Sequence, residues 1–128
     1  MIANDTSALM AILQNEPEAE RCIALIEREN RLVMSAATVA EALIVSERRN
    51  VGDEMGRLID GLAIEIVSVT AASAGRVAAC YRRWGKGLHP PGLIFGDYFA
   101  YDVAKEHGCP PLYVGADFSR TDITAPVC

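Results

Sequence analysis

Short apolar segments alternate with pairs of helical stretches along this chain, and this alternation constrains the fold more than any other feature. We predict strands at 1–4, 31–35, 64–69 and 111–114, with a short fifth at 122–124. Two helices are predicted between consecutive strands, at 7–14 and 15–29, 37–49 and 53–61, and 70–84 and 95–107. Strands joined through helices run parallel in one sheet, and the helices cover its faces. The sequence therefore predicts an α/β fold with a mostly parallel sheet of four to five strands and helices on both faces.

Length and charge limit the classes of function. The 128 residues predict one domain spanning 1–128, and 51% hydrophobic residues are enough for an ordinary core. There is no signal-like N-terminus and no apolar run of membrane-spanning length, so we expect a cytoplasmic protein without membrane contact. The net charge of −5 argues against nucleic-acid binding through a bulk positive field, so any such contact must be local.

Four acidic residues stand where a parallel sheet gathers its ligand-binding groups. Asp5 follows the first strand and Asp117 follows the fourth. Glu41 lies near the start of the helix after the second strand, and Asp97 lies in the first turn of the helix before the fourth. All four positions fall at the carboxyl edge of the sheet. Each acid is surrounded by small or apolar residues, and buried carboxylates that gather in this way imply a bound cation.

The composition of this set favours a particular kind of metal. Carboxylate oxygens suit Mg²⁺ or Mn²⁺, and the four acids have no His or Cys at ligand spacing, which argues against zinc. A carboxylate-held Mg²⁺ can activate water and stabilise the leaving oxygen of a phosphodiester. Thr6 and Ser7, next to Asp5, can hydrogen-bond a carboxylate or cap the helix that follows, and we expect at least one of them only to cap.

Other charged residues fit ordinary structural roles. Asp102 falls five residues after Asp97, which turns it away from the same helix face. Asp122 is expected to be a local structural partner, and His107 ends a helix, where a cation suits the helix dipole. The basic stretch 81–87 has two open interpretations, a solvated helix end or a local contact with nucleic acid.

The segments that carry the acids resemble PIN-domain ribonucleases of the VapC toxin type. The resemblance runs in order over nearly the whole chain, and its most specific part is 85–93 followed by Phe95-Gly96-Asp97. That part lies within a matching segment over 81–96, and the other matching segments are 1–9, 35–42, 97–105 and 115–123. It implies a PIN-like three-layer sandwich and matches Asp5, Glu41, Asp97 and Asp117 to the acidic quartet of that family.

The resemblance also implies an activity and partners. It implies a Mg²⁺-dependent endoribonuclease that cleaves tRNA or ribosomal RNA, with Mn²⁺ as a possible substitute. The enzyme would be the toxin of a toxin–antitoxin pair, would bind a small VapB-like antitoxin, and would form a homodimer. Arg82, Arg83 and Lys86 are the candidates to contact the RNA backbone.

Two departures from the family pattern leave alternatives open. The family often has Asn or Asp where Ala116 stands, and Asn4 replaces a strand residue that is usually apolar. A catalytically inactive PIN-like binding module is therefore one alternative. The other is a phospho-signalling receiver-like domain, which needs an acceptor Asp after a middle strand and a Lys after a late one. Neither Val69-Thr70 nor Gly115-Ala116 supplies these residues.

Overall fold

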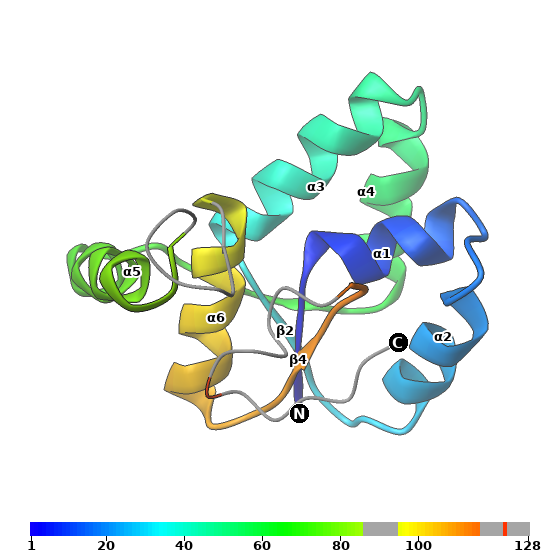
Figure 1. Ribbon diagram of the computed structural model, residues 1–128. Helices are drawn as coiled ribbons and strands as arrows, with labels where there is room; N and C mark the ends of the chain where they lie inside the picture. Colours follow the sequence, from blue (N-terminus) through cyan, green and yellow to red (C-terminus); the bar gives the residue numbers. More distant parts are fainter. Residues whose placement is uncertain (86–94, 116–121, 123–128) are drawn as a thin grey trace.

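The computed structural model describes residues 1–85, 95–115 and 122 (Figure 1). Lys86, Ala116 and Asp117 lie outside these residues, as does the predicted fifth strand beyond Asp122.

The described residues form a parallel sheet with the predicted order of elements. The strands are β1 (Ile2–Asn4), β2 (Leu32–Ser35), β3 (Glu65–Val67) and β4 (Pro111–Leu112). The helices are α1 (Thr6–Leu13), α2 (Ala19–Glu27), α3 (Ala36–Arg48), α4 (Gly52–Gly61), α5 (Ala71–Trp84) and α6 (Phe95–His107). The strand order is β3-β2-β1-β4, and every pairing is parallel. The predicted α/β class and parallel sheet are confirmed.

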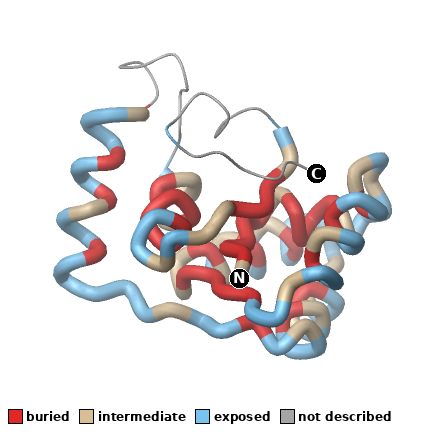
Figure 2. Tube along the Cα trace, turned by 90° about the horizontal axis from the view of Figure 1, so that it is seen from below, coloured by how far each residue is buried: buried red, intermediate tan, exposed pale blue. Residues whose placement is uncertain are grey.

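Alternating side chains of the strands enter two different cores, which gives the fold three layers. Ile2, Leu32 and Met34 pack in the large core with residues of α1, α2 and α4. Ala3 and Val33 point to the opposite face, where they pack against α6. Buried segments therefore run through the centre of the molecule and along the inner helix faces (Figure 2).

The helix α5 stands outside this sandwich and packs against α6 (Figure 1). Its buried apolar positions, Val77 and Cys80, contact Tyr98 and Tyr101 of α6. Thr70 caps α5 through a reciprocal capping box with Ser73. The α5/α6 pair thus has a core of its own beside the sheet.

Three predicted boundaries were wrong. We expected Asn15 to cap the second helix, but α2 starts at Ala19, and Asn15 has a φ of 50° and closes α1 in the left-handed conformation. The third strand was predicted over 64–69, whereas β3 covers only Glu65–Val67 at the sheet edge. The fourth was predicted over 111–114, and β4 ends at Leu112.

In the part of the chain that the structure describes, no helix is both long and apolar enough to cross a membrane.

Candidate active site

The strand order reverses direction at β1, and ligands of open α/β sheets bind at such a point. The chain moves from β1 outward to β2 and β3 and then returns to the other side of β1 to form β4. The crevice outside the carboxyl ends of β1 and β4 is therefore the expected ligand site. Asp5 directly follows β1, and the Ser7 hydroxyl at the start of α1 accepts a 3.0 Å hydrogen bond from Val114 N, two residues beyond β4.

Asp5 is a buried carboxylate that is only half satisfied by hydrogen bonds. It is 5% exposed and caps α1, and its Oδ2 accepts from the Ser7 backbone N at 3.2 Å and from Ser7 Oγ at 2.6 Å. Its Oδ1 is buried and accepts no hydrogen bond from the described residues. Burial and, to a smaller extent, the charge of Glu41 raise the pKa of Asp5 to about 6, against the lowering effect of the Ser7 hydrogen bonds.

Glu41 lies beside Asp5 because both contact the start of α1. The Thr6 hydroxyl donates a 2.6 Å hydrogen bond to Glu41 Oε1 and also lies 3.4 Å from the Thr38 carbonyl oxygen. Thr6 is the first residue of α1, and Glu41 is in the second turn of α3. The hydroxyls of Thr6 and Ser7 therefore each donate a hydrogen bond to a carboxylate, and the residue that caps α1 is Asp5. The expectation that Thr6 or Ser7 would only cap the helix was wrong.

Asp97 lies near the same edge of the sheet, because the residue before it, Gly96, contacts Glu41. The carboxylate of Glu41 packs directly against Gly96 in the first turn of α6. Asp97 is the next residue and is half-buried. Asp5, Glu41 and the helix turn that carries Asp97 thus lie at one edge of the sheet, while Asp117 falls outside the described residues.

The described acids make up part of a metal site and not a complete one. Within residues 1–85, 95–115 and 122, no three His, Cys, Asp or Glu side chains form a group that could hold a metal ion. The oxygen ligands that are present fit a cation. Asp5 Oδ1 is buried and accepts no hydrogen bond from the described residues, and Glu41 supplies a further carboxylate nearby. Oxygen donors of this kind suit Mg²⁺ or Mn²⁺.

Asn4 brings a second buried polar side chain to this edge. It is 1% exposed, and its Nδ2 donates a long 3.4 Å hydrogen bond to the Val33 carbonyl oxygen. Its Oδ1, like Asp5 Oδ1, has no donor in the described part of the chain. The departure from an apolar strand residue therefore places an amide next to the first acid.

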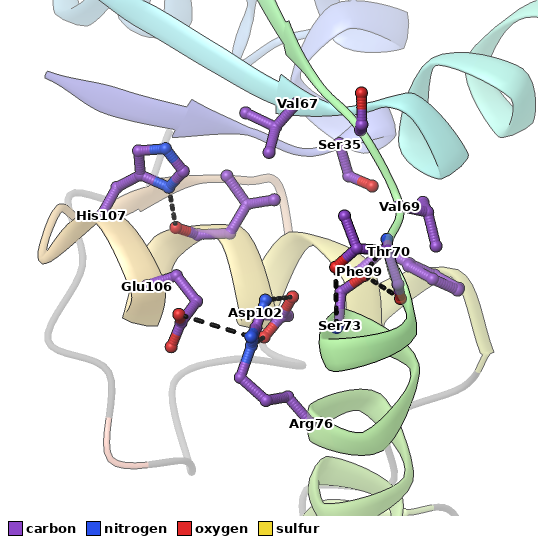
Figure 3. A pocket seen from close by; sticks show the side chains of 12 residues that line it. Ser35, Val67, Val69, Thr70, Ser73, Arg76, Phe99, Asp102, Glu106 and His107 are labelled. Atoms are coloured by element: carbon purple, nitrogen blue, oxygen red, sulfur yellow. Dashed lines mark hydrogen bonds and ion pairs between the residues drawn. The ribbon is translucent and has the colours of Figure 1, made fainter.

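The remaining acids of α6 and its surroundings have structural partners. Asp102 Oδ1 accepts a 2.6 Å hydrogen bond from Arg76 Nε across the α5/α6 contact, and Glu106 lies 3.5 Å from the same guanidinium (Figure 3). These residues line a separate cavity of about 280 Å³ that extends along β3 and α6. Asp102 therefore has a structural partner on α5.

Asp122 is also a structural residue, as predicted, although its partners are distant in sequence. It accepts hydrogen bonds from Tyr101 Oη at 2.6 Å and Lys105 Nζ at 3.0 Å. Arg83, one of the predicted RNA contacts, lies 3.7 Å from Asp122 and 4.8 Å from the centre of the Trp84 ring. Arg82 is exposed on the same helix turn, and Lys86 lies outside the described residues.

One contributor to this site was not predicted from sequence. The contact between Gly96 and Glu41 joins residues that are far apart in the chain, so spacing could not reveal it. A signal existed, because glycine is unfavourable inside a helix and its presence there often has a packing reason.

The sequence comparisons place this chain among known proteins. The family described as PIN domain matches residues 2–123. Ribonuclease VapC30 of Mycobacterium tuberculosis is 44% identical over 123 residues, which are 93% of each chain. Ribonuclease VapC of Mycolicibacterium smegmatis is 41% identical over 125 residues, which are 94% of this chain and 96% of the relative.

Solved structures share the fold at lower sequence identity. Mycobacterium tuberculosis VapC20, described as a sarcin-ricin loop cleaving toxin, superposes with a TM-score of 0.81 at 16% identity over 98% of both chains. A toxin–antitoxin complex from Klebsiella pneumoniae gives a TM-score of 0.73 at 17% identity over the whole of both chains. At these identities the structures bear on the fold alone.

Proposed function

We propose that this chain, which belongs to the PIN domain family and to its VapC ribonucleases, is a toxin that cleaves RNA with the help of a divalent cation. The observation that carries the proposal is the buried carboxylate of Asp5 at the crevice between β1 and β4. One oxygen of this carboxylate lacks a hydrogen-bond donor among the described residues, and Glu41 lies beside it. A second negative charge next to a buried one is unfavourable unless a cation joins them.

The proposed roles of the site residues follow from their positions. Asp5, Asp97 and Asp117 would hold Mg²⁺, or Mn²⁺ in its place, directly or through water, and Glu41 would complete the site or orient the attacking water. When bound, the cation supplies positive charge that stabilises the phosphate oxygens as the phosphodiester bond breaks. Ser7 fixes Asp5 through Oδ2 and leaves Oδ1 available.

The remaining steps concern the RNA itself. Water attacks the phosphorus in line with the leaving oxygen, which gives a 5′-phosphate and a 3′-hydroxyl. Arg82, Arg83 and Lys86 contact the RNA backbone near the site. RNA can approach a protein of net charge −5 because the cation neutralises the acidic pocket. The substrate class we propose is tRNA or ribosomal RNA, in line with the sarcin-ricin loop named for VapC20.

The proposed partners are a small VapB-like antitoxin and a second copy of this chain. Solved relatives include a VapBC2 assembly from Rickettsia felis bound to a DNA fragment from its promoter, with a TM-score of 0.70. We propose that the antitoxin covers the acidic crevice with an apolar helix and a basic side chain, and that the complex acts in the cytoplasm. Co-expression should then relieve toxicity and co-purify a complex. A chain that is harmless alone and purifies from its native host without a partner would contradict the toxin assignment.

Cleavage of RNA by matched variants tests the activity. Total tRNA and ribosomal RNA are incubated with Mg²⁺, with EDTA as the metal-free condition. Asp97→Asn keeps the shape of the side chain and removes its charge, so cleavage should fall by orders of magnitude while the fold persists. Asp60→Asn, on the exposed face of α4, is the control and should cleave normally.

Each result bears on a different part of the proposal. Equal cleavage by wild type and Asp97→Asn would remove Asp97 from the site, and equal cleavage in EDTA would rule out the metal mechanism. A wild-type protein that cleaves neither RNA would favour the inactive binding module. The receiver-like alternative has lost its support through the family membership.

A further inference from the structure

We propose that Gly96 is a positioning residue for Glu41, because the absence of a side chain at this position lets the glutamate carboxylate lie against the first turn of α6. The inference rests on the metal-dependent function proposed above. It gives Gly96 a role that depends on the space left by its missing side chain. It concerns a contact between α3 and α6, two helices that meet at the carboxyl edge of the sheet.

The contact between Gly96 and Glu41 leaves no room for a methyl group. A Cβ placed on Gly96 would lie 2.6 Å from Glu41 Cδ and 2.9 Å from Oε1, and it would overlap Oε2. Non-bonded carbon atoms prefer separations of about 3.5–4.0 Å. Because the clashing atoms belong to the end of a flexible side chain, a methyl group would displace the carboxylate and leave the helix backbone in place.

The same carboxylate is also held by Thr6. Its hydroxyl donates the 2.6 Å hydrogen bond to Glu41 Oε1, and Thr6 is adjacent to Asp5. Glu41 is therefore held between the start of α1 and the start of α6. The N-terminal turn of a helix is also a favourable place for a negative charge. A shift away from Gly96 would disturb both the Thr6 hydrogen bond and the spacing between Glu41 and Asp5.

Other glycines of the chain provide matched controls. Gly75 lies on the exposed face of α5, and a Cβ there would meet no atom within 4 Å. Gly52, at the start of α4, resembles Gly96 more closely, because an added Cβ would clash with the carboxylate of Glu47. Glu47 is exposed and lies outside the proposed site, so it can move away without consequence for metal binding.

The first measurement is Mn²⁺ affinity by isothermal titration calorimetry. We compare wild type, Gly96→Ala, Glu41→Ala and the double variant, together with Gly52→Ala and Gly75→Ala. Residues that orient metal ligands typically change affinity 10- to 100-fold, so Gly96→Ala should weaken Mn²⁺ binding roughly 10-fold or more. It should cause no further loss once Glu41 is Ala. The two control variants should bind Mn²⁺ as the wild type does.

The second measurement is the melting temperature of the same variants without metal. Alanine is a better helix former than glycine, so Gly75→Ala should raise the melting temperature. Gly96→Ala should raise it only when Glu41 has been replaced by Ala, since the clash then disappears. A Gly96→Ala change that has the same effect on melting with and without Glu41 would overturn the proposed contact.

The two measurements separate this inference from the proposed function. Wild-type Mn²⁺ affinity in Gly96→Ala overturns the positioning role, and so does an equal loss of affinity with and without Glu41. If the wild type binds no Mn²⁺ and cleaves no RNA, the proposed function fails, and the positioning role toward a metal fails with it. The melting data then still decide whether Gly96 accommodates Glu41.

Discussion

Two buried aspartates of this chain have opposite surroundings. Asp102, 7% exposed in the α5/α6 pair, faces the guanidinium of Arg76, which donates to both carboxylate oxygens at 2.6 and 3.3 Å. Asp5, 5% exposed at the end of β1, accepts hydrogen bonds from the described residues only through Oδ2, and the charge of another acid, Glu41, raises its pKa. Both side chains are removed from water to a similar degree, yet within the described part of the chain only Asp102 has a cation beside it.

This difference separates a structural acid from a functional one. A buried charge is tolerated when it is paired, and Arg76 neutralises Asp102 as part of the fold. At Asp5 the chain supplies hydroxyl and amide donors but leaves a charge without a protein cation among the described residues. The proposed ion would fill that role from solution. The comparison therefore predicts that Asp5 responds to protons and metals, whereas Asp102 contributes to stability alone.

The largest expected effect is the dependence of stability on pH through Asp5. Its pKa is about 6 in the fold against an ordinary 3.8, which corresponds to about 3 kcal/mol at about 1.4 kcal/mol per pKa unit. Because the folded pKa is the higher one, the folded state binds more protons between these values. The stability contribution is therefore fully present below about pH 4 and is lost as the pH rises through about 6.

Urea unfolding in EDTA at pH 3 and pH 7.5 measures this contribution. Asp5→Asn has no carboxylate to titrate, so it should gain about 3 kcal/mol relative to wild type between the two pH values. Using the difference between the two proteins cancels the other titrating groups that they share. A difference that stays constant with pH would show that Asp5 does not carry a raised pKa.

A slightly smaller effect is expected from the metal. A ligand that binds only the folded state stabilises it by about 2.7 kcal/mol at one hundred times its dissociation constant. Mg²⁺ or Mn²⁺ should therefore raise the melting temperature at pH 7.5, and should do so less at pH 4.5, where Asp5 is protonated. Asp5→Asn combined with Asp97→Asn should abolish the response. A full response in that double variant would place the metal elsewhere in the molecule.

Asp102→Asn is the counterpart on the structural side of the comparison. It removes a charge-assisted interaction with Arg76 and should lower the free energy of unfolding by about 1–3 kcal/mol. It should leave the Mn²⁺-induced rise in melting temperature and the cleavage of RNA unchanged. Loss of the metal response in Asp102→Asn would break the comparison, because it would make the α5/α6 acid part of the site.

The sequence was sufficient where a local pattern determines position. The end of β1 places Asp5, and the parallel order of strands brings the starts of α3 and α6 to the same edge, so the site region followed from the order of elements. The family resemblance rested on the same segments. The start of α2 was missed because Asn15 can either cap a helix or close one in the left-handed conformation, and packing decides between them.

Contacts between distant residues could not be predicted. Arg76 and Asp102 lie 26 residues apart on different helices, and nothing in their spacing indicates a pair. The same holds for Thr6 with Glu41 and for Gly96 with Glu41, which depend on how α1, α3 and α6 meet in space. Sequence therefore located the acids, whereas the structure was needed to show which of them is neutralised and which is not.

The smallest expected effect concerns Arg83, which lies on the structural helix pair but is a candidate for the RNA backbone. Its side chain is 61% exposed, and its contact with Asp122 is a surface ion pair of 3.7 Å, so Arg83→Ala should barely change stability. Losing one phosphate contact should weaken RNA binding by a few-fold and reduce the slope of log affinity against log salt by about one. Fluorescence anisotropy with tRNA in the Asp97→Asn background measures binding without cleavage.

Arg57→Ala is the matched control, because Arg57 is 70% exposed, lies on α4 and has its own ion pair with Glu54. An unchanged salt slope for Arg83→Ala would confine the α5/α6 pair to a structural role, and an equal change for Arg57→Ala would show that the contact is not local.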